Sequence, residues 1–419
     1  MYPDLSYLFH DLFGTELDNW TSIFKMFGVM LMFAFLTAAF FFHNELKRKA
    51  GLGIYQPTKV KIIHGEPAKV GELISNGIFG FILGFKGFYI SQNFADFQKD
   101  PAAVLLSAKG NWLIGIAVAL LFAGLMYWEK KKKALAKPKS EITDIYPHDR
   151  IADLTMMAAV GGILGAKIFA ILEEPSGFFS DPIGTFFSGS GLAIYGGLIG
   201  GYLAVTWYMR KHNIPFWHTA DAVAPALIFA YGVGRIGCQL AGDGDWGIVA
   251  GAQPDWWFLP DWMWSYDFPH NVNNANTADG FRAAMGGLVD GCNEEIFNAS
   301  RTYPIEDRCA EACGIRYCHF IPEKVFPTPF YETIMSFLIG GYLWAIRKKN
   351  QIPGMIFFIY LILNGIERFF IEKIRVNVTY DFLPFQPTQA EVISLLIFIA
   401  GVVGVVWLKK KHAEPEANP

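Results

Sequence analysis

Apolar stretches about as long as a bilayer is thick constrain this chain more than any other feature. A helix that spans the hydrocarbon core needs about 20 mostly apolar residues. The stretches of this kind are 21–44, 73–92, 111–128, 151–172, 191–209, 217–240, 330–346, 354–374 and 390–408. The composition agrees, since 53% of the residues are hydrophobic and 17% are charged. We therefore expect an all-α polytopic membrane protein with about nine transmembrane helices.

Basic clusters predict how these helices cross the membrane. They follow every odd-numbered stretch, at 47–49, 130–133, 210–211, 347–349 and 409–411. Because lysine and arginine stay on the cytoplasmic side, the N-terminus is predicted outside, in the periplasm, and the C-terminus in the cytoplasm. Lys373 and Arg375 fall at an outer end instead, which marks them as candidates for function. We expect no cleavable signal peptide, because the first apolar run has no basic lead.

The whole chain, 1–419, is interpreted as one membrane-embedded domain with two additions. Residues 50–128 hold an extra transmembrane helix pair, and 248–325 form a periplasmic loop subdomain. That loop carries four of the five cysteines: Cys292, Cys309, Cys313 and Cys318. An even set of cysteines in an oxidising compartment favours disulfides, and the sequence leaves their pairing open. The alternative is a zinc site that includes His319.

Cationic side chains gather in the outer half of the predicted bilayer. At a helical rise of about 1.5 Å per residue, Arg235 lies roughly 28 Å above the cytoplasmic face, Arg368 about 21 Å and Lys167 about 24 Å. A guanidinium at membrane depth costs from roughly 3 to more than 10 kcal/mol, so an anion is expected there. The plainer alternatives are side chains that reach up to the headgroups, and an Arg368–Glu372 ion pair within one helix.

Glycines mark the fourth and fifth stretches, at 161–165 and 196–201. Small residues at this spacing let two helices approach closely. A glycine face also leaves room for a lipid headgroup against the backbone. Close packing is the plain expectation, and it is compatible with a binding role for Gly196 and Gly197.

The segment 234–247, Gly-Arg-Ile-Gly-Cys-Gln-Leu-Ala-Gly-Asp-Gly-Asp-Trp-Gly, resembles the signature of the prolipoprotein diacylglyceryl transferases. The family pattern is roughly Gly-Arg-x-Gly-Asn-Phe-x-Asn-Gly-Glu-x-Trp-Gly, one residue shorter. Five further segments are similar to the family in the same order, namely 153–167, 195–200, 221–225, 327–332 and 365–372. The resemblance covers about 20–44, 148–247 and 326–408, which leaves the helix pair and the cysteine loop as additions.

Several positions depart from the family pattern, and the change at the family histidine bears on the identity of the proton acceptor. Tyr195 stands where the family has histidine, and Phe27 where it has a first-helix tyrosine. Cys238 and Ala241 replace two asparagines, and Asp243 replaces a glutamate. Both arginines of the pattern and Glu372 remain. The resemblance therefore implies an electrostatic role for the arginines, whereas a histidine base does not carry over.

The resemblance implies transfer of the diacylglyceryl group of phosphatidylglycerol to the lipobox cysteine of exported preprolipoproteins. A thioether forms and glycerol 1-phosphate leaves. The implied catalytic residues are Arg235, Arg368, Tyr195 and Asp243. The implied substrate-binding residues are Gly196, Gly197, Gly234, Gly237, Cys238, Gly247, Tyr331, Glu372 and Lys167. No metal or cofactor is expected, because the arginines supply the positive field.

The implied location is the bacterial inner (cytoplasmic) membrane, with the site toward the periplasm. The expected partners are phosphatidylglycerol, exported preprolipoproteins and the bilayer. A net charge of −3 gives no reason to expect nucleic acid. The general base stays open among Tyr195, Asp243 and Asp245.

Two other functions remain as alternatives. A transporter of an anionic substrate would explain intramembrane arginines, but the sequence shows no inverted repeat between its halves. A non-catalytic relative that only binds phosphatidylglycerol would fit the changes at Tyr195 and Cys238. Cys238 itself is either a reactive thiol beside an arginine or a small packing residue.

Overall fold

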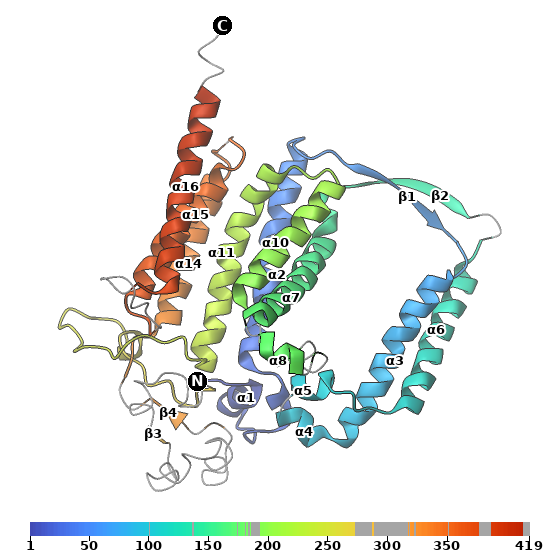
Figure 1. Ribbon diagram of the computed structural model, residues 1–419, viewed down its shortest axis with the longest axis horizontal. Helices are drawn as coiled ribbons and strands as arrows, with labels where there is room; N and C mark the ends of the chain where they lie inside the picture. The colour runs from blue at the N-terminus through green and yellow to red at the C-terminus, as the bar shows by residue number, and fades with distance from the viewer. Residues whose placement is uncertain are drawn as a thin grey trace. The chain divides into compact units, whose positions relative to one another are not determined.

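The structure is a computed structural model, and its helices and strands are shown in Figure 1. It describes residues 1–99, 101–135, 138–173, 175–180, 182, 185, 193–272, 287–288, 317, 319–321, 324–350, 352–376 and 387–413. The chain divides into two compact units. One comprises Met1–Leu46 and Phe216–Pro419, and the other comprises Lys47–Pro215.

The first unit is a helical bundle with an N-terminal cap. Its helices are α1 (Leu5–Phe13), α2 (Met26–Gly51, whose last turn belongs to the second unit), α11 (Phe216–Ala241), α14 (Thr328–Ile346), α15 (Met355–Glu372) and α16 (Gln389–Ala413). Short 3-10 turns lie at Trp20–Ile23 and Asp261–Met263. Two short strands, β3 (Gly287–Leu288) and β4 (His319–Phe320), pair antiparallel.

Helices α11, α14 and α15 share one buried apolar core. Ala224 and Ile228 of α11, Leu343 of α14 and Ile356 of α15 are almost fully buried together. Asp221 fixes one end of this core, because its carboxylate accepts the backbone N–H groups of Gly354 at 2.7 Å and Phe357 at 3.0 Å. The side chain of α11 thus caps the first turn of α15, where amides have no partner within their own helix.

Helix α2 joins the same core through an aromatic and an ionic contact. The ring of Phe41 stacks on Phe229 of α11 at 4.2 Å and meets Trp344 of α14 edge-on. Arg347, just after α14, pairs with the buried Glu45 at 2.9 Å. These contacts hold α2, α11 and α14 as one packed group.

The second unit contains two helix pairs and a small sheet. Its elements are β1 (Thr58–His64), α3 (Val70–Gln92), α4 (Phe94–Lys99), α5 (Pro101–Leu106), α6 (Trp112–Lys133), β2 (Lys139–Ile145), a 3-10 turn (Pro147–Arg150), α7 (Ile151–Glu173), α8 (Pro175–Ser180) and α10 (Ile194–Lys211). Helix α3 packs on α6, and α7 packs on α10. The α7–α10 contact depends on glycine, since a Cβ on Gly165 would overlap the carbonyl oxygen of Gly196.

Strands β1 and β2 pair antiparallel, with Thr58 opposite Ile145 and His64 opposite Lys139. This sheet is not expected from the sequence. Its strands carry lysines and acidic residues among the apolar ones, so neither gives an apolar stretch of the length that marks a span. The strands flank the added helix pair in the sequence, immediately before α3 and after α6.

The apolar stretches expected to be helical are helical in the described part of the chain. Among the residues that the structure describes, six segments are long and apolar enough to cross a membrane: α2, α3, α6, Pro147–Glu173, α11 and α16. Helix α15 is not among these six segments, because its 18 residues include three charged ones, Glu367, Arg368 and Glu372. The structure thus confirms a helical, polytopic membrane protein, while the count of nine spans and their orientation stay predictions. The four loop cysteines lie outside the described residues.

Candidate functional site

The site is built around one buried carboxylate, that of Glu332 on α14. Its Oε2 lies 2.9 Å from Nε of Arg235 on α11, and its Oε1 lies 2.9 Å from Nη1 of Arg368 on α15. The hydroxyl of Tyr231 donates to the same Oε1 at 3.0 Å. The Glu332 side chain is 0% exposed. A charge buried this deeply is tolerated only when it is paired with opposite charges and hydrogen-bonded. Because both guanidiniums pair with this one carboxylate, it fixes their positions relative to each other.

Asp245 forms a second, more open carboxylate bridge in the site. One oxygen contacts Nη1 of Arg235, and the other contacts Nη2 of Arg375. The Asp245 side chain is 27% exposed, whereas those of Arg235 and Arg375 are 13% and 11% exposed. Burial lowers the pKa of Arg375 to about 10, so its guanidinium is still charged at neutral pH. Arg235 therefore lies between a closed carboxylate and a partly accessible one.

The loop after α11 brings Asp245 and Arg375 together. Gly247 donates its N–H to the carbonyl of Phe326 at 2.8 Å, and the N–H of Ile248 reaches the carbonyl of Ile374 at the same distance. A Cβ on Gly247 would lie 2.5 Å from the carbonyl oxygen of Ile374 and 2.9 Å from Cβ of Phe326, too close for a real side chain. Thr328 secures the same loop by donating to the carbonyl oxygen of Asp245 at 2.6 Å.

Two further carboxyl groups accompany Arg368 on α15. Glu372, one turn on, lies 3.1 Å from Nη2 of Arg368, so the ion pair that the sequence left as the plainer alternative for Arg368 is present. Glu367 is 1% exposed, and neither of its carboxyl oxygens has a hydrogen-bond partner among the described residues. The buried charges are thus largely paired within the site, with Glu367 as the exception.

Cys238 and Asp243 line the same region of α11 and its loop. The Cys238 sulfur lies 3.5 Å from Nη1 of Arg235, and Asp243 accepts the backbone N–H of Asp245 at 3.4 Å. Ligand atoms of Cys238, Asp243 and Asp245 lie within 4.8 Å of one another, a spacing that suits a metal ion. Arg235 contacts two of these three residues, however, and its positive charge opposes a cation there.

The predicted glycines divide by what surrounds them. Gly237 packs α11 against α2, because its Cβ would lie 2.9 Å from Cβ of Met30 and 3.5 Å from Phe27. Gly234 has open space around it. Tyr331 holds the outer loop, since its hydroxyl donates to the carbonyl of Met263 at 2.7 Å. Of the two glycines, Gly234 is the one that close packing does not require.

Four predicted site residues belong to the second unit: Lys167, Tyr195, Gly196 and Gly197. Lys167 is buried on α7, and Tyr195 is 37% exposed in the first turn of α10. Gly196 packs against α7 as described above. Their expected approach to the arginines stays a prediction.

The sequence predicted the two arginines and named Glu372 and Asp245 near them, but it did not identify Glu332 and Tyr231 as their partners. Glu332 was seen only as the end of a motif, and Tyr231 not at all. Glu332 lies on a different helix from both arginines, and Tyr231 lies one turn before Arg235 on α11; both helices are mostly apolar. A lone glutamate in an apolar stretch is the signal that could have identified Glu332. Arg375 was singled out because it breaks the charge pattern, and the structure places it in the site.

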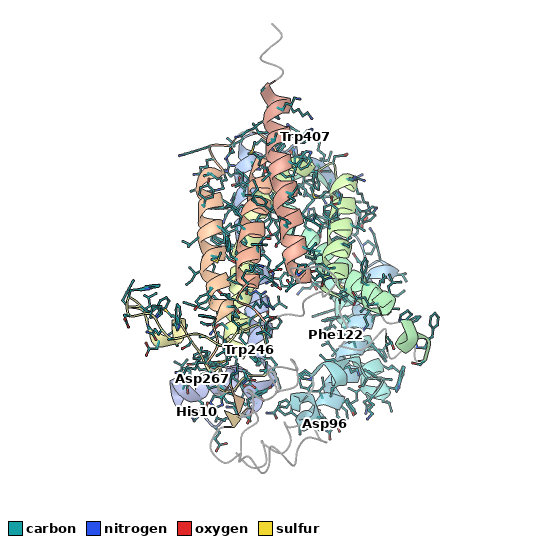
Figure 2. All side chains as sticks on the ribbon, turned by 60° about the vertical axis from the view of Figure 1, so that its left-hand side comes forward. His10, Asp96, Phe122, Trp246, Asp267 and Trp407 are labelled. Carbon is teal, nitrogen blue, oxygen red and sulfur yellow. The ribbon has the colours of Figure 1, made fainter. Side chains whose placement is uncertain are left out.

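Figure 2 shows where the site lies along the bundle. Trp246, the neighbour of Asp245, lies at the opposite end of the first unit from Trp407 of α16. Trp246 is buried and packs on Phe268 with ring centres 5.3 Å apart. The site therefore occupies the end of the bundle that carries the long loop between α11 and α14.

The chain is similar to one family over most of its length. The model described as prolipoprotein diacylglyceryl transferase matches residues 112–407. Three relatives are each named phosphatidylglycerol–prolipoprotein diacylglyceryl transferase. The protein of Glaesserella parasuis is 25% identical over 77% of this chain and 98% of its own length. The protein of Clostridioides difficile is 29% identical over 63% of this chain and 80% of its own length. The protein of Oceanobacillus iheyensis is 25% identical over 64% of this chain and 76% of its own length.

Proposed function

The chain belongs to the prolipoprotein diacylglyceryl transferase family, and we propose that it transfers the diacylglyceryl group of phosphatidylglycerol to the lipobox cysteine of preprolipoproteins. The cysteine sulfur attacks the glycerol carbon that carries the phosphate ester. A carbon–sulfur bond forms, the carbon–oxygen bond breaks, and glycerol 1-phosphate leaves with the bonding electron pair. The thiol proton passes to a base or to the leaving phosphate.

The observation that carries this proposal is the pairing of Arg235 and Arg368 on one buried carboxylate. A leaving phosphate gains negative charge, and preorganised positive donors stabilise that charge most effectively in a water-poor site. Guanidinium groups recognise phosphate oxygens through paired N–H donors. Glu332 holds both groups in place before the lipid arrives, so little reorganisation is needed in the transition state.

Asp245 is the anion that the lipid phosphate would replace. Its carboxylate already lies between two guanidiniums, those of Arg235 and Arg375, as a phosphate would. It is partly exposed, whereas Glu332 is sealed from solvent. In our proposal the phosphate displaces Asp245 from the arginines, and the freed carboxylate becomes available to accept the thiol proton.

Other residues could also accept that proton. A free thiol has a pKa of about 8.5, so its deprotonation needs only modest help. Asp243 lies next to Asp245 in the loop, and Tyr195 stands in the motif position of the family histidine. We assign lipid binding to Gly196, Gly197 and Lys167 on the same motif grounds. The proposal needs no cofactor.

The location follows from the charge pattern of the sequence. We propose that the protein lies in the inner membrane of a bacterium with its N-terminus outside and its C-terminus in the cytoplasm. The site would then open toward the periplasm, where exported preprolipoproteins present their cysteines. Phosphatidylglycerol would enter from the outer leaflet.

Complementation tests this function directly. The gene should restore growth and lipoprotein maturation in a strain depleted of its own transferase. The purified protein should convert a lipobox peptide and phosphatidylglycerol into a thioether-linked product, detected by mass. Binding of phosphatidylglycerol without any transfer would instead identify a non-catalytic relative. Phosphatidylglycerol-independent anion uptake into vesicles would identify a transporter.

A further inference from the structure

The described part of the outer loop carries a cluster of exposed aromatic side chains next to the site. In the loop residues 254–264, Trp256 is 71% exposed and Phe258 is 88% exposed. Leu259 and Trp262 are also exposed. Soluble surfaces rarely gather so many large apolar side chains in one short segment. We call residues 254–264 the aromatic loop.

The aromatic loop is held in a defined conformation by hydrogen bonds within it and with the residues just before it. The indole N–H of Trp264 donates to the carbonyl of Gly251 at 3.0 Å. Gln253 donates to the carboxylate of Asp261 at 3.1 Å. The backbone N–H of Trp257 reaches the carbonyl of Pro254 at 2.9 Å. The exposed rings are therefore presented by a fixed turn, and two prolines stiffen its backbone.

Two contacts connect the aromatic loop to the site and to the bundle. The hydroxyl of Tyr331 donates to the carbonyl of Met263, and Glu332, the next residue, holds both arginines. The ring of Trp262 packs on Phe330 in the first turn of α14, with centres 4.8 Å apart. The exposed aromatic surface thus continues onto the end of a bundle helix.

The position of the aromatic loop along the bundle matches the membrane boundary. In Figure 1 the loop leaves the lower end of α11 and projects sideways at the level where α14 and α16 end. Figure 2 shows the same projection from another direction. If these helices cross the bilayer, the loop lies at the height of the headgroups. Tryptophan is enriched at that height, because its ring is apolar and its N–H is polar.

We propose that the aromatic loop inserts into the outer leaflet of the lipid bilayer and holds the site at the level of the headgroups. The inserted rings are those of Trp256 and Phe258, the most exposed rings of the loop. Asp255 and Asp261 are the charged residues of the loop and remain in the headgroup layer. The proposal rests on the membrane placement given above, though not on the transfer reaction.

Photocrosslinking tests this insertion in the full-length protein. Phe258 and Trp256 are each replaced by p-benzoylphenylalanine, and the protein is placed in vesicles of phosphatidylcholine and phosphatidylglycerol. His10, which is exposed and lies farther from the bundle than Trp246 in Figure 2, receives the same replacement as a control. Mass spectrometry of the irradiated protein then measures lipid adducts at each position.

We expect at least a tenfold excess of lipid adduct at positions 256 and 258 over position 10. Equal adduct yields at the three positions would overturn the proposal. A crosslink to another segment of the chain, or to a second copy, would also overturn it, because a protein would then cover the rings. Since the readout is a lipid adduct, an inactive protein would still report on insertion.

Discussion

Arg235 and Arg368, on two different helices, contact opposite oxygens of a single carboxylate, that of Glu332. Each contact measures 2.9 Å, and the carboxylate is sealed from solvent. The distance between the two guanidiniums is therefore set by a third residue on a third helix. This arrangement makes Glu332 a positioning residue for both arginines.

Removal of the charge should destabilise the protein strongly at one buried glutamate and little at another. Glu332→Gln leaves two guanidiniums without their shared counter-charge, and breaking a buried ion pair costs about 3–5 kcal/mol. Glu367→Gln removes a carboxyl group that has no hydrogen-bond partner among the described residues, so stability should change by less than about 1 kcal/mol or rise. Thermal unfolding in detergent, followed by tryptophan fluorescence, measures both. Equal destabilisation by the two substitutions would contradict this assignment.

The two loop aspartates should differ in their effect on transfer. Asp245 contacts Arg235 and Arg375, whereas Asp243 contacts a backbone amide. In our proposal the displaced Asp245 carboxylate accepts the thiol proton, and a positioned proton acceptor contributes roughly 100- to 10,000-fold, so Asp245→Asn should lower transfer by about 100-fold or more. Asp243→Asn should have a smaller effect. Steady-state transfer to a lipobox peptide compares the two, and a larger loss for Asp243→Asn would reverse their roles.

Gly247 should not accept a side chain. A Cβ there would crowd both the side chain and the carbonyl of Phe326, so Gly247→Ala must displace the loop that carries Asp245. Overpacking of this kind costs about 1–3 kcal/mol, and it should lower the melting temperature and transfer together. Gly251→Ala is the matched control, because open space surrounds Gly251 in the same loop. If both variants behaved alike, close packing at Gly247 would not explain its presence.

His270 should make the outer loop sensitive to acid. Burial lowers its pKa, and it lies against Tyr7 and the carbonyl of Tyr317, with Asp11, Asp18 and the N-terminal amine nearby. Since the folded state disfavours the protonated ring, its contribution to stability is complete above pH about 6.5 and declines as the pH falls below that value. Melting temperatures of the wild type and His270→Asn, measured from pH 7.5 to 5, should diverge in acid. Parallel pH profiles would contradict this expectation.

The sequence predicted the helices well because their signal is local. A stretch of about 20 apolar residues needs no knowledge of its neighbours, and each expected stretch is helical where the structure describes it. The β1–β2 sheet was missed because its strands are short, charged and more than 70 residues apart in sequence.

Those parts of the site that have a local signal in the sequence were predicted, and those that depend on long-range contacts were not. Arg235 and Arg368 stand out as charges among apolar residues, and the Arg368–Glu372 pair, which was one of the plainer alternatives, requires only helical spacing. The path of the loop decides which aspartate contacts Arg235. The sequence does not give this path, because the motif is one residue longer there than the family pattern. Asp245 and Arg375 are 130 residues apart, and only the backbone contacts of Gly247 and Ile248 bring them together.

The central claim is that two guanidiniums together stabilise the leaving phosphate. It is tested most directly by the transfer rates of Arg235→Lys and Arg368→Lys, measured with phosphatidylglycerol and a lipobox peptide. Arg347→Lys is the control, because Arg347 also pairs with a buried glutamate, Glu45, but outside the site. We predict that each site variant loses about 100-fold or more in rate while the control stays near wild type. Wild-type rates in either site variant, with the protein folded, would contradict the account.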